Sequence, residues 1–137
     1  TYTVPLFFKL TNSNEDLIKK SIINTIDKNP ILRMCVNDEY EYSILPTPEF
    51  IINSLNIEEE NLENLLKERS KTSFIRQNQK MLSVEIINIE KADYLILNLT
   101  HHHVLTDAFS AELIKTMIVR EYASLKGGDS EEIDQSI

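Results

Sequence analysis

Cysteine is nearly absent from this sequence: Cys35 is the only one among 137 residues. A single cysteine excludes an internal disulfide and fits a reducing compartment, so we expect a cytoplasmic protein. Because Cys35 lies in an apolar stretch, we expect a buried and inert thiol. The sequence also lacks a secretory signal pattern and any apolar run long enough to span a bilayer, so we expect no membrane partner.

Positive charge is also in short supply. Lysine and arginine number 14 against 22 aspartates and glutamates, which gives a net charge of −8. This balance argues against nucleic acid and against an anionic membrane surface as partners. Much of the acid is local, in Glu58-Glu59-Glu60 and in the stretch from Asp129 to Asp134.

The length and the apolar content set the scale of the fold. A chain of 137 residues, 42% of them hydrophobic, is one domain at most and can bury a core. It begins at Thr1 and enters an apolar stretch at once, which suggests a segment of a longer protein. Gly127 and Gly128 end the last predicted helix. We therefore divide the chain into a folded subdomain at residues 1–126 and an acidic flexible tail or linker at residues 127–137.

Hydrophobic periodicity predicts the secondary structure. In chain order we expect a strand at residues 2–10, a helix from Ser13 to Pro30, strands at 32–36 and 40–45, a helix at 58–71, strands at 81–89 and 94–100, and a helix at 109–125. Residues 49–57 fit neither pattern, and residues 72–80 are polar and predicted to be irregular. The apolar stripe of the last helix comprises Phe109, Leu113, Ile114, Met117, Ile118 and Tyr122. This order predicts an α+β fold with a mixed, largely antiparallel sheet and helices packed on it.

The residues that suggest chemistry lie between the last strand and the last helix. Such crossings favour ligands and catalytic groups, because a rigid scaffold holds them while the loop exposes them. His102, His103 and Asp107 have the spacing His-His-x-x-x-Asp, and Ala108 follows. This resembles the His-His-x-x-x-Asp-Gly motif of condensation domains of non-ribosomal peptide synthetases, which belong to a superfamily with chloramphenicol acetyltransferase.

A second match lies upstream of the motif. The first strand and helix are followed by Asn29-Pro30-Ile31-Leu32-Arg33, which is similar to the opening strand, first helix and Leu-Arg strand of the family in the same order. The resemblance covers roughly residues 2–125. It implies a chloramphenicol acetyltransferase-like half-domain, the N-terminal half of a condensation domain.

The resemblance also implies an activity and partners. Condensation domains form an amide bond between an acyl or aminoacyl thioester and an acceptor amine. Both substrates are carried on the phosphopantetheine of carrier protein domains, so the chain itself is expected to bind no cofactor. The C-terminal half is a further expected partner, and the parent is expected to be an acyltransferase while the isolated chain is inactive. We expect an exposed, apolar cleft face around the last helix, able to drive self-association.

The histidines are expected to differ in role. The resemblance makes His103 the catalytic residue, and an imidazole with a pKa of about 6.5 can accept a proton or stabilise the tetrahedral intermediate. In an extended strand His102 points to the opposite face from His103, so we expect it to pack against or orient its neighbour. His101 receives no role.

Three further residues support the predicted site. Asp107 suits the start of a helix, but the resemblance pairs it with Arg33 in a structural ion pair. An arginine in the apolar strand at residues 32–36 needs such a partner if it is buried. Ala108 replaces the family glycine and adds one methyl group where a backbone or a pantetheine arm would approach.

Other functions remain open at this point. His103 and Asp107 are four residues apart and could bind a metal, but adjacent histidines on a strand diverge and the sequence has no second His or Cys cluster, so we expect none. A coenzyme A-dependent acyltransferase, an epimerisation domain and a non-catalytic interaction module would each keep the same motif and fold. The donor and the acceptor are not identified by the sequence.

Overall fold

The computed structural model describes the chain except residues 1, 38, 72, 75–78, 103–108 and 128–137. The elements are β1 (Tyr2–Thr11), α1 (Glu15–Lys28), β2 (Met34–Val36), β3 (Tyr42–Ile44), β4 (Ile52–Ile57), α2 (Leu62–Arg69), β5 (Ser73–Phe74), β6 (Gln79–Lys80), β7 (Leu82–Ile89), β8 (Tyr94–His102) and α4 (Ala111–Leu125). In this part of the chain no helix is long and apolar enough to cross a membrane.

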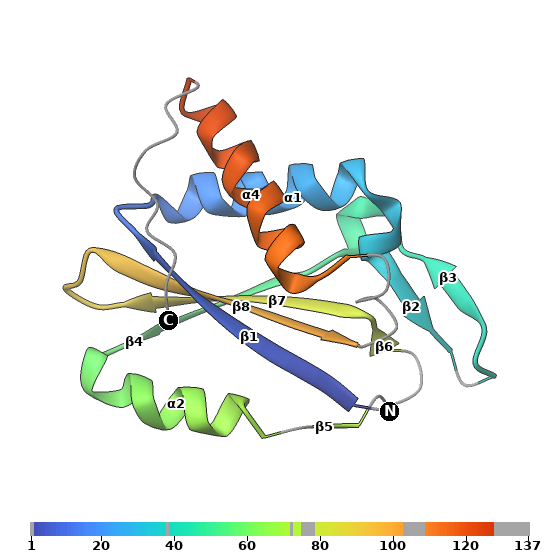
Figure 1. Cartoon of the computed structure of the whole chain (residues 1–137), viewed down its shortest axis with the longest axis horizontal. Helices are drawn as coiled ribbons and strands as arrows, with labels where there is room; N and C mark the ends of the chain where they lie inside the picture. The colour runs from blue at the N-terminus through green and yellow to red at the C-terminus, as the bar shows by residue number, and fades with distance from the viewer. Residues whose placement is uncertain (1, 38, 72, 75–78, 103–108, 128–137) are drawn as a thin grey trace.

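A five-stranded sheet in the order β4-β7-β8-β1-β5 forms the centre of the molecule. Strand β4 is parallel to β7, and the other neighbours are antiparallel. Helices α1 and α4 cover one face of this sheet and α2 covers the other (Figure 1). A second sheet in the order β3-β2-β6 lies beside it. The predicted α+β fold with a mixed, largely antiparallel sheet is confirmed.

The core has two parts, one on each face of β8. On the helix-rich face, alternate residues of β8 contact α1 and α4 through Leu95, Leu97, Leu99, Ile18, Ile22, Ile26, Ile114 and Ile118. On the other face, a smaller cluster joins α2 to the sheet through Ile87, Ile89, Ile96, Leu62, Leu65 and Leu66. This arrangement buries the central strand on both faces.

Two segments that carried no clear pattern form strands. Residues 49–57 include β4, an edge strand in which Asn53, Ser54 and Asn56 are exposed and polar, so both of its faces carry polar residues. Strands β5 and β6 lie within residues 72–80, which were predicted to be irregular. Each is only two residues long, too short for an alternating pattern to be recognised.

The start of α1 is also different from the prediction. Asn14, not Ser13, is the N-cap, and its side-chain oxygen accepts a hydrogen bond from the Leu17 amide at 3.0 Å. The Ser13 hydroxyl instead donates to the carbonyl of Leu10. Both are good capping residues, so the sequence alone could not choose between them.

The strand predicted at residues 32–36 begins later. Residues Pro30–Arg33 form a 3₁₀ turn, and β2 starts at Met34. Cys35 is half-buried, with Sγ 3.5 Å from Oγ of Ser43 on β3. The expected buried thiol is therefore wrong, because β2 belongs to the small sheet and not to the main core.

The buried face of α4 includes a lysine. Lys115 is 8% exposed, whereas Leu113, placed in the predicted apolar stripe, is 43% exposed. The Lys115 ammonium lies 5.5 Å from the ring centroid of Phe8 and 3.5 Å from Oε1 of Glu112. A lysine can bury its aliphatic stem while its charge stays paired, so hydrophobicity alone predicted this face incorrectly.

We expect two neighbouring residues of α4 to differ sharply in their contribution to stability. Ile114 is 1% exposed and Leu113 is 43% exposed. Ile114→Ala should lower the free energy of unfolding by about 2–5 kcal/mol, and Leu113→Ala should change it by less than about 0.5 kcal/mol. Urea denaturation measures both values, and equal losses would contradict this placement of the helix.

Candidate active site

The strand before the predicted motif is the central strand of the main sheet. Strand β8 pairs with β7 on one side and β1 on the other, and it ends at His102. The last backbone bond on the β7 side runs from the His102 amide to the Met81 carbonyl at 2.9 Å. The strand predicted at residues 94–100 is confirmed, and the structure shows that it is the central strand of the sheet and extends to His102.

The two described histidines face opposite sides of the sheet. His101 alternates with Leu99 and Leu97, so it lies on the face covered by α1 and α4, whereas His102 lies on the face covered by α2. Both are buried, at 6% and 4% exposure. His103, the predicted catalytic residue, lies outside the described residues, so its role stays a prediction.

His101 has an unusual environment for a titratable group. Its Nδ1 is buried and, within the described part of the chain, has no hydrogen-bond partner. Burial lowers the pKa of this imidazole, because the charged form loses its hydration, and the backbone oxygen of Leu99 offsets only part of that effect. Sequence reasoning gave this residue no role, since nothing in the pattern distinguished it from its neighbours.

Arg33 is not in a strand, which corrects the prediction. It is the last residue of the 3₁₀ turn, half-buried between the end of α1 and the residue after β3. Its Nε donates to the Ile26 carbonyl at 3.0 Å and its Nη1 to the Leu45 carbonyl at 2.6 Å. The expected partner, Asp107, lies outside the described residues. The structure thus supplies Arg33 with two backbone acceptors that the sequence did not indicate.

The helix that follows the motif begins at Ala111. Its N-cap is Ser110, whose hydroxyl oxygen accepts a hydrogen bond from the Leu113 amide at 3.0 Å. The start predicted at Phe109 is therefore two residues early. Asp107 and Ala108 precede the described part of this helix and lie outside the described residues.

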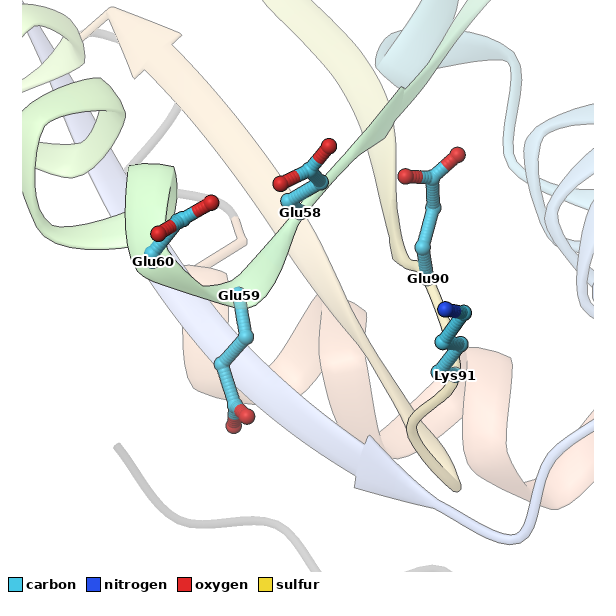
Figure 2. A pocket seen from close by; sticks show the side chains of 5 residues that line it. All are labelled: Glu58, Glu59, Glu60, Glu90 and Lys91. Carbon is cyan, nitrogen blue, oxygen red and sulfur yellow. The ribbon is translucent and has the colours of Figure 1, made fainter.

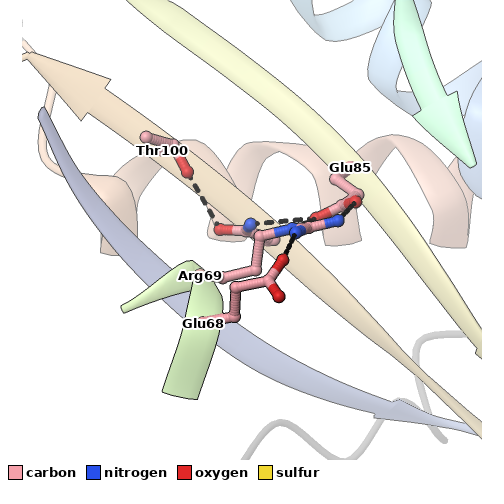
Figure 3. A network of polar contacts seen from close by, with 5 residues as sticks. Glu68, Arg69, Glu85 and Thr100 are labelled. Carbon is pink, nitrogen blue, oxygen red and sulfur yellow. Dashed lines mark hydrogen bonds and ion pairs between the residues drawn. The ribbon is translucent and has the colours of Figure 1, made fainter. Parts of the chain in front are cut away.

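A polar network crosses the α2 side of the sheet near β8 (Figure 3). Arg69, the last residue of α2, donates Nε and Nη2 to the two carboxylate oxygens of Glu85 on β7, at 3.1 and 3.0 Å. Asn98 on β8 donates to the same carboxylate at 3.2 Å and accepts from the Thr100 hydroxyl at 3.1 Å. Sequence reasoning missed this network, because its members come from three separate elements.

An acidic pocket of about 320 Å³ lies at the opposite end of the β7–β8 hairpin from His102 (Figure 2). Glu58, Glu59, Glu60, Glu90 and Lys91 line it. The hydrogen bond that protonated Glu58 can donate to the Glu60 carboxylate raises the pKa of Glu58, and the charge of Glu90 acts in the same direction. Among the described residues, no group of three or more His, Cys, Asp or Glu is arranged to hold a metal ion.

Several solved structures share this fold. VibH, an NRPS condensation enzyme, aligns with a TM-score of 0.71 and 15% identity over 95% of this chain and 32% of its own. SgcC5 from Streptomyces globisporus aligns with a TM-score of 0.69 and 18% identity over 91% of this chain and 30% of its own. The X-domain from teicoplanin biosynthesis aligns with a TM-score of 0.69 and 15% identity over 92% and 28%. The chain therefore spans less than a third of the length of each.

These likenesses define the fold as one shared with condensation-enzyme structures, with β8 at the centre of the main sheet and ending at His102. No curated protein sequence matches the chain. The family described as Condensation domain matches residues 1–136. The chain belongs to the condensation-domain family, which confirms the resemblance that the motif indicated.

Acidification is expected to destabilise the fold through His101. Its pKa is lower in the folded chain than the ordinary 6.5, so the unfolded chain binds this proton more readily. The stability contributed by neutral His101 is fully present above pH 6.5 and is lost as the pH falls through the lowered folded pKa. Urea titrations over this range should show a shallower loss of unfolding free energy in His101→Gln than in the wild type, and parallel curves would contradict the assignment.

Proposed function

We propose that this chain is the N-terminal half of a condensation domain of a non-ribosomal peptide synthetase and that His103 acts in amide-bond formation. The observation that carries the proposal is the position of β8. The central strand of a sheet that belongs to this family ends at His102, one residue before His103. A reacting group that directly follows such a strand is held by a scaffold that is itself buried on both faces.

The proposed chemistry is acyl transfer from a thioester to an amine. The amine nitrogen attacks the thioester carbonyl carbon, a C–N bond forms, and the C–S bond then breaks to release a thiol. The attacking nitrogen must lose a proton, and the tetrahedral intermediate carries an oxyanion. His103 would either accept that proton or stabilise the intermediate, and general catalysis of this kind contributes about 10²–10⁴-fold.

We assign structural roles to the residues around His103. Arg33 has five N–H donors, and the two backbone acceptors that it meets leave donors free to bind a carboxylate. Asp107 would use them to hold the motif loop against the end of α1. His102 would support the strand end from the α2 side. Ala108 would leave room for a pantetheine arm, although its methyl group takes up space that the family glycine leaves open.

The proposed partners follow from the length of the chain. Because it spans less than a third of the related structures, we propose that the C-terminal half supplies the second wall of the site. Carrier protein domains would deliver both substrates on phosphopantetheine, and the chain would bind no cofactor of its own. Leu6 and Leu113 are 39% and 43% exposed. Leu6 lies on the same face of β1 as Phe8 and Leu10, which pack toward α1 and α4, and Leu113 is on α4. Both would contact the missing half and favour self-association without it.

A non-catalytic role is the second candidate. The similar X-domain is described in a complex with OxyB, so one protein with this fold binds another protein. The same fold would then serve as an interaction module here. Loss of activity on substitution of His103 separates the two candidates, because a module that only binds does not depend on a reactive imidazole.

The ion-pair proposal predicts unequal melting shifts. Asp107→Ala should lower the melting temperature more than His103→Ala, because removing one partner of a buried pair costs up to about 3–5 kcal/mol. Thermal unfolding by circular dichroism measures both. In a double-mutant cycle, Arg33→Leu and Asp107→Ala should be non-additive; additive losses, or equal shifts for Asp107→Ala and His103→Ala, would count against the pair.

The half-site proposal predicts that the isolated chain is inactive although the parent protein is active. Without the second half the thioester is not positioned, and positioning accounts for as much as ~7–11 kcal/mol of a barrier. Acyl- and aminoacyl-loaded carrier proteins would be offered to each, with the product measured by mass spectrometry. His103→Ala in the parent should reduce turnover about 10²–10⁴-fold. Turnover by the isolated chain that His103→Ala abolishes would refute the half-site proposal.

A further inference from the structure

The middle of the β7–β8 pair contains polar side chains that are largely removed from water. Glu85 and Asn98 face each other across these two strands. The Glu85 side chain is 16% exposed and Asn98 is 4% exposed. They are joined directly at 3.2 Å and tied to α2 by the two bonds from Arg69 (Figure 3). The hydrogen bond to Glu85 raises the pKa of the Arg69 guanidinium, so Arg69 keeps its charge in this contact.

Stability alone does not explain these residues. Removing a carboxylate and an amide from water is unfavourable unless both are hydrogen-bonded. Well-packed apolar residues of similar size are often as stabilising as a buried ion pair or more so. The neighbouring positions on this face of the two strands, Ile87 and Ile96, are in fact isoleucine and fully buried. The polar residues must therefore contribute something that isoleucines would not.

Apolar side chains alone do not select one register between β7 and β8. In the observed register Leu82, Val84 and Ile86 face His101, Leu99 and Leu97. If β8 moved by two residues, the same three side chains would face Leu99, Leu97 and Leu95, all apolar. Each residue would keep its face of the sheet, because the side-chain period of a strand is two. The facing pairs on the helix side would thus be apolar in the shifted register as well.

The polar pair distinguishes the two registers. In the shifted register Glu85 would face Ile96, and Asn98 would face Ser83, which breaks the bond between Glu85 and Asn98. Glu85 would still be bound by Arg69, but the Asn98 amide, which is 4% exposed, would lose the Glu85 carboxylate as its acceptor. Losing the acceptor of a buried donor carries a desolvation penalty. The turn at Lys91, with φ of 61°, also constrains the hairpin, but it acts at the far end of the strands from His102.

We propose that Arg69, Glu85 and Asn98 are positioning residues that fix the register of β8 against β7 and so determine where the motif strand delivers His102. A two-residue shift would move His102 about 7 Å along β7. A displacement of this size is far larger than the error in position that a catalytic group can have and still reach its substrate. The claim about the register does not depend on the proposed function. Only the claim that the register matters for the active site rests on that function.

The test replaces the network with apolar strand residues. Glu85→Ile/Asn98→Ile should fold but lose its single register. Two-dimensional NMR of the uniformly labelled chain should show a second set of amide signals for β7 and β8 and a second pair of ring signals for His102. Cross-strand NOEs in that second set should connect Val84 with Leu97 in place of Leu99.

Two further variants make the result specific. Ser83→Val/Thr100→Val changes the next facing pair in the same strands. It removes the bond from Thr100 to Asn98 but keeps the cross-strand bond between Glu85 and Asn98, and it should keep one set of signals. The exchanged pair Glu85→Asn/Asn98→Glu restores a carboxylate and an amide across the strands and should return most of the signal to one set.

The outcomes that overturn the proposal are equally definite. A single set of signals with native NOEs in Glu85→Ile/Asn98→Ile would refute it, as would two sets in the Ser83→Val/Thr100→Val control. If the double isoleucine variant does not fold, the single variant Asn98→Val tests the proposal instead. It leaves Arg69 and Glu85 paired but removes the cross-strand bond, so it should still show two sets, and one native set would refute the proposal.

Discussion

The burial of β8 on both faces is the constraint on which the rest of this structure depends. Residues 95–99 are all buried, whereas an antiparallel sheet often leaves one face to water. A strand buried in this way needs a cover on each side, and α1 with α4 provides one while α2 provides the other. The same burial holds His101 and His102 out of water at the strand end. The placement of the histidine segment is therefore a property of the whole fold.

Two arginines attach the covering layers by directional bonds. Arg33 binds the Ile26 carbonyl near the end of α1 and the Leu45 carbonyl after β3. Arg69 ends α2 and binds Glu85 on the sheet. Hydrophobic contact is non-directional, so it presses a helix onto a sheet without fixing its position along the strands. Arg69 supplies this direction for α2 on the main sheet, whereas Arg33 fixes the end of α1 relative to the small sheet that contains β3.

The sequence could predict what is local and repeated. Alternation over a long run predicted β1, β7 and β8, and the motif was recognisable because its residues are close in the chain. The edge strand β4 was missed because its outward residues are polar, and Lys115 was missed because a periodic pattern treats charge as exposure. Arg33 was assigned to a strand because the carbonyls that hold it are 7 and 12 residues away. The network of Arg69, Glu85 and Asn98 spans separations of 16 and 13 residues, and no pattern in one strand indicates its partner.

The two-sided burial and the polar network are connected. A strand that is apolar on both faces gains stability from almost any alignment with an apolar neighbour, so the feature that stabilises β8 also makes its register ambiguous. Ambiguity is removed only by groups that tolerate few partners, and a buried carboxylate and a buried amide meet that description. They lie in the middle of the strand pair, between the turn at Lys91 and the end at His102. A segment that is positioned by the end of a doubly buried strand therefore depends on polar residues within the strand pair.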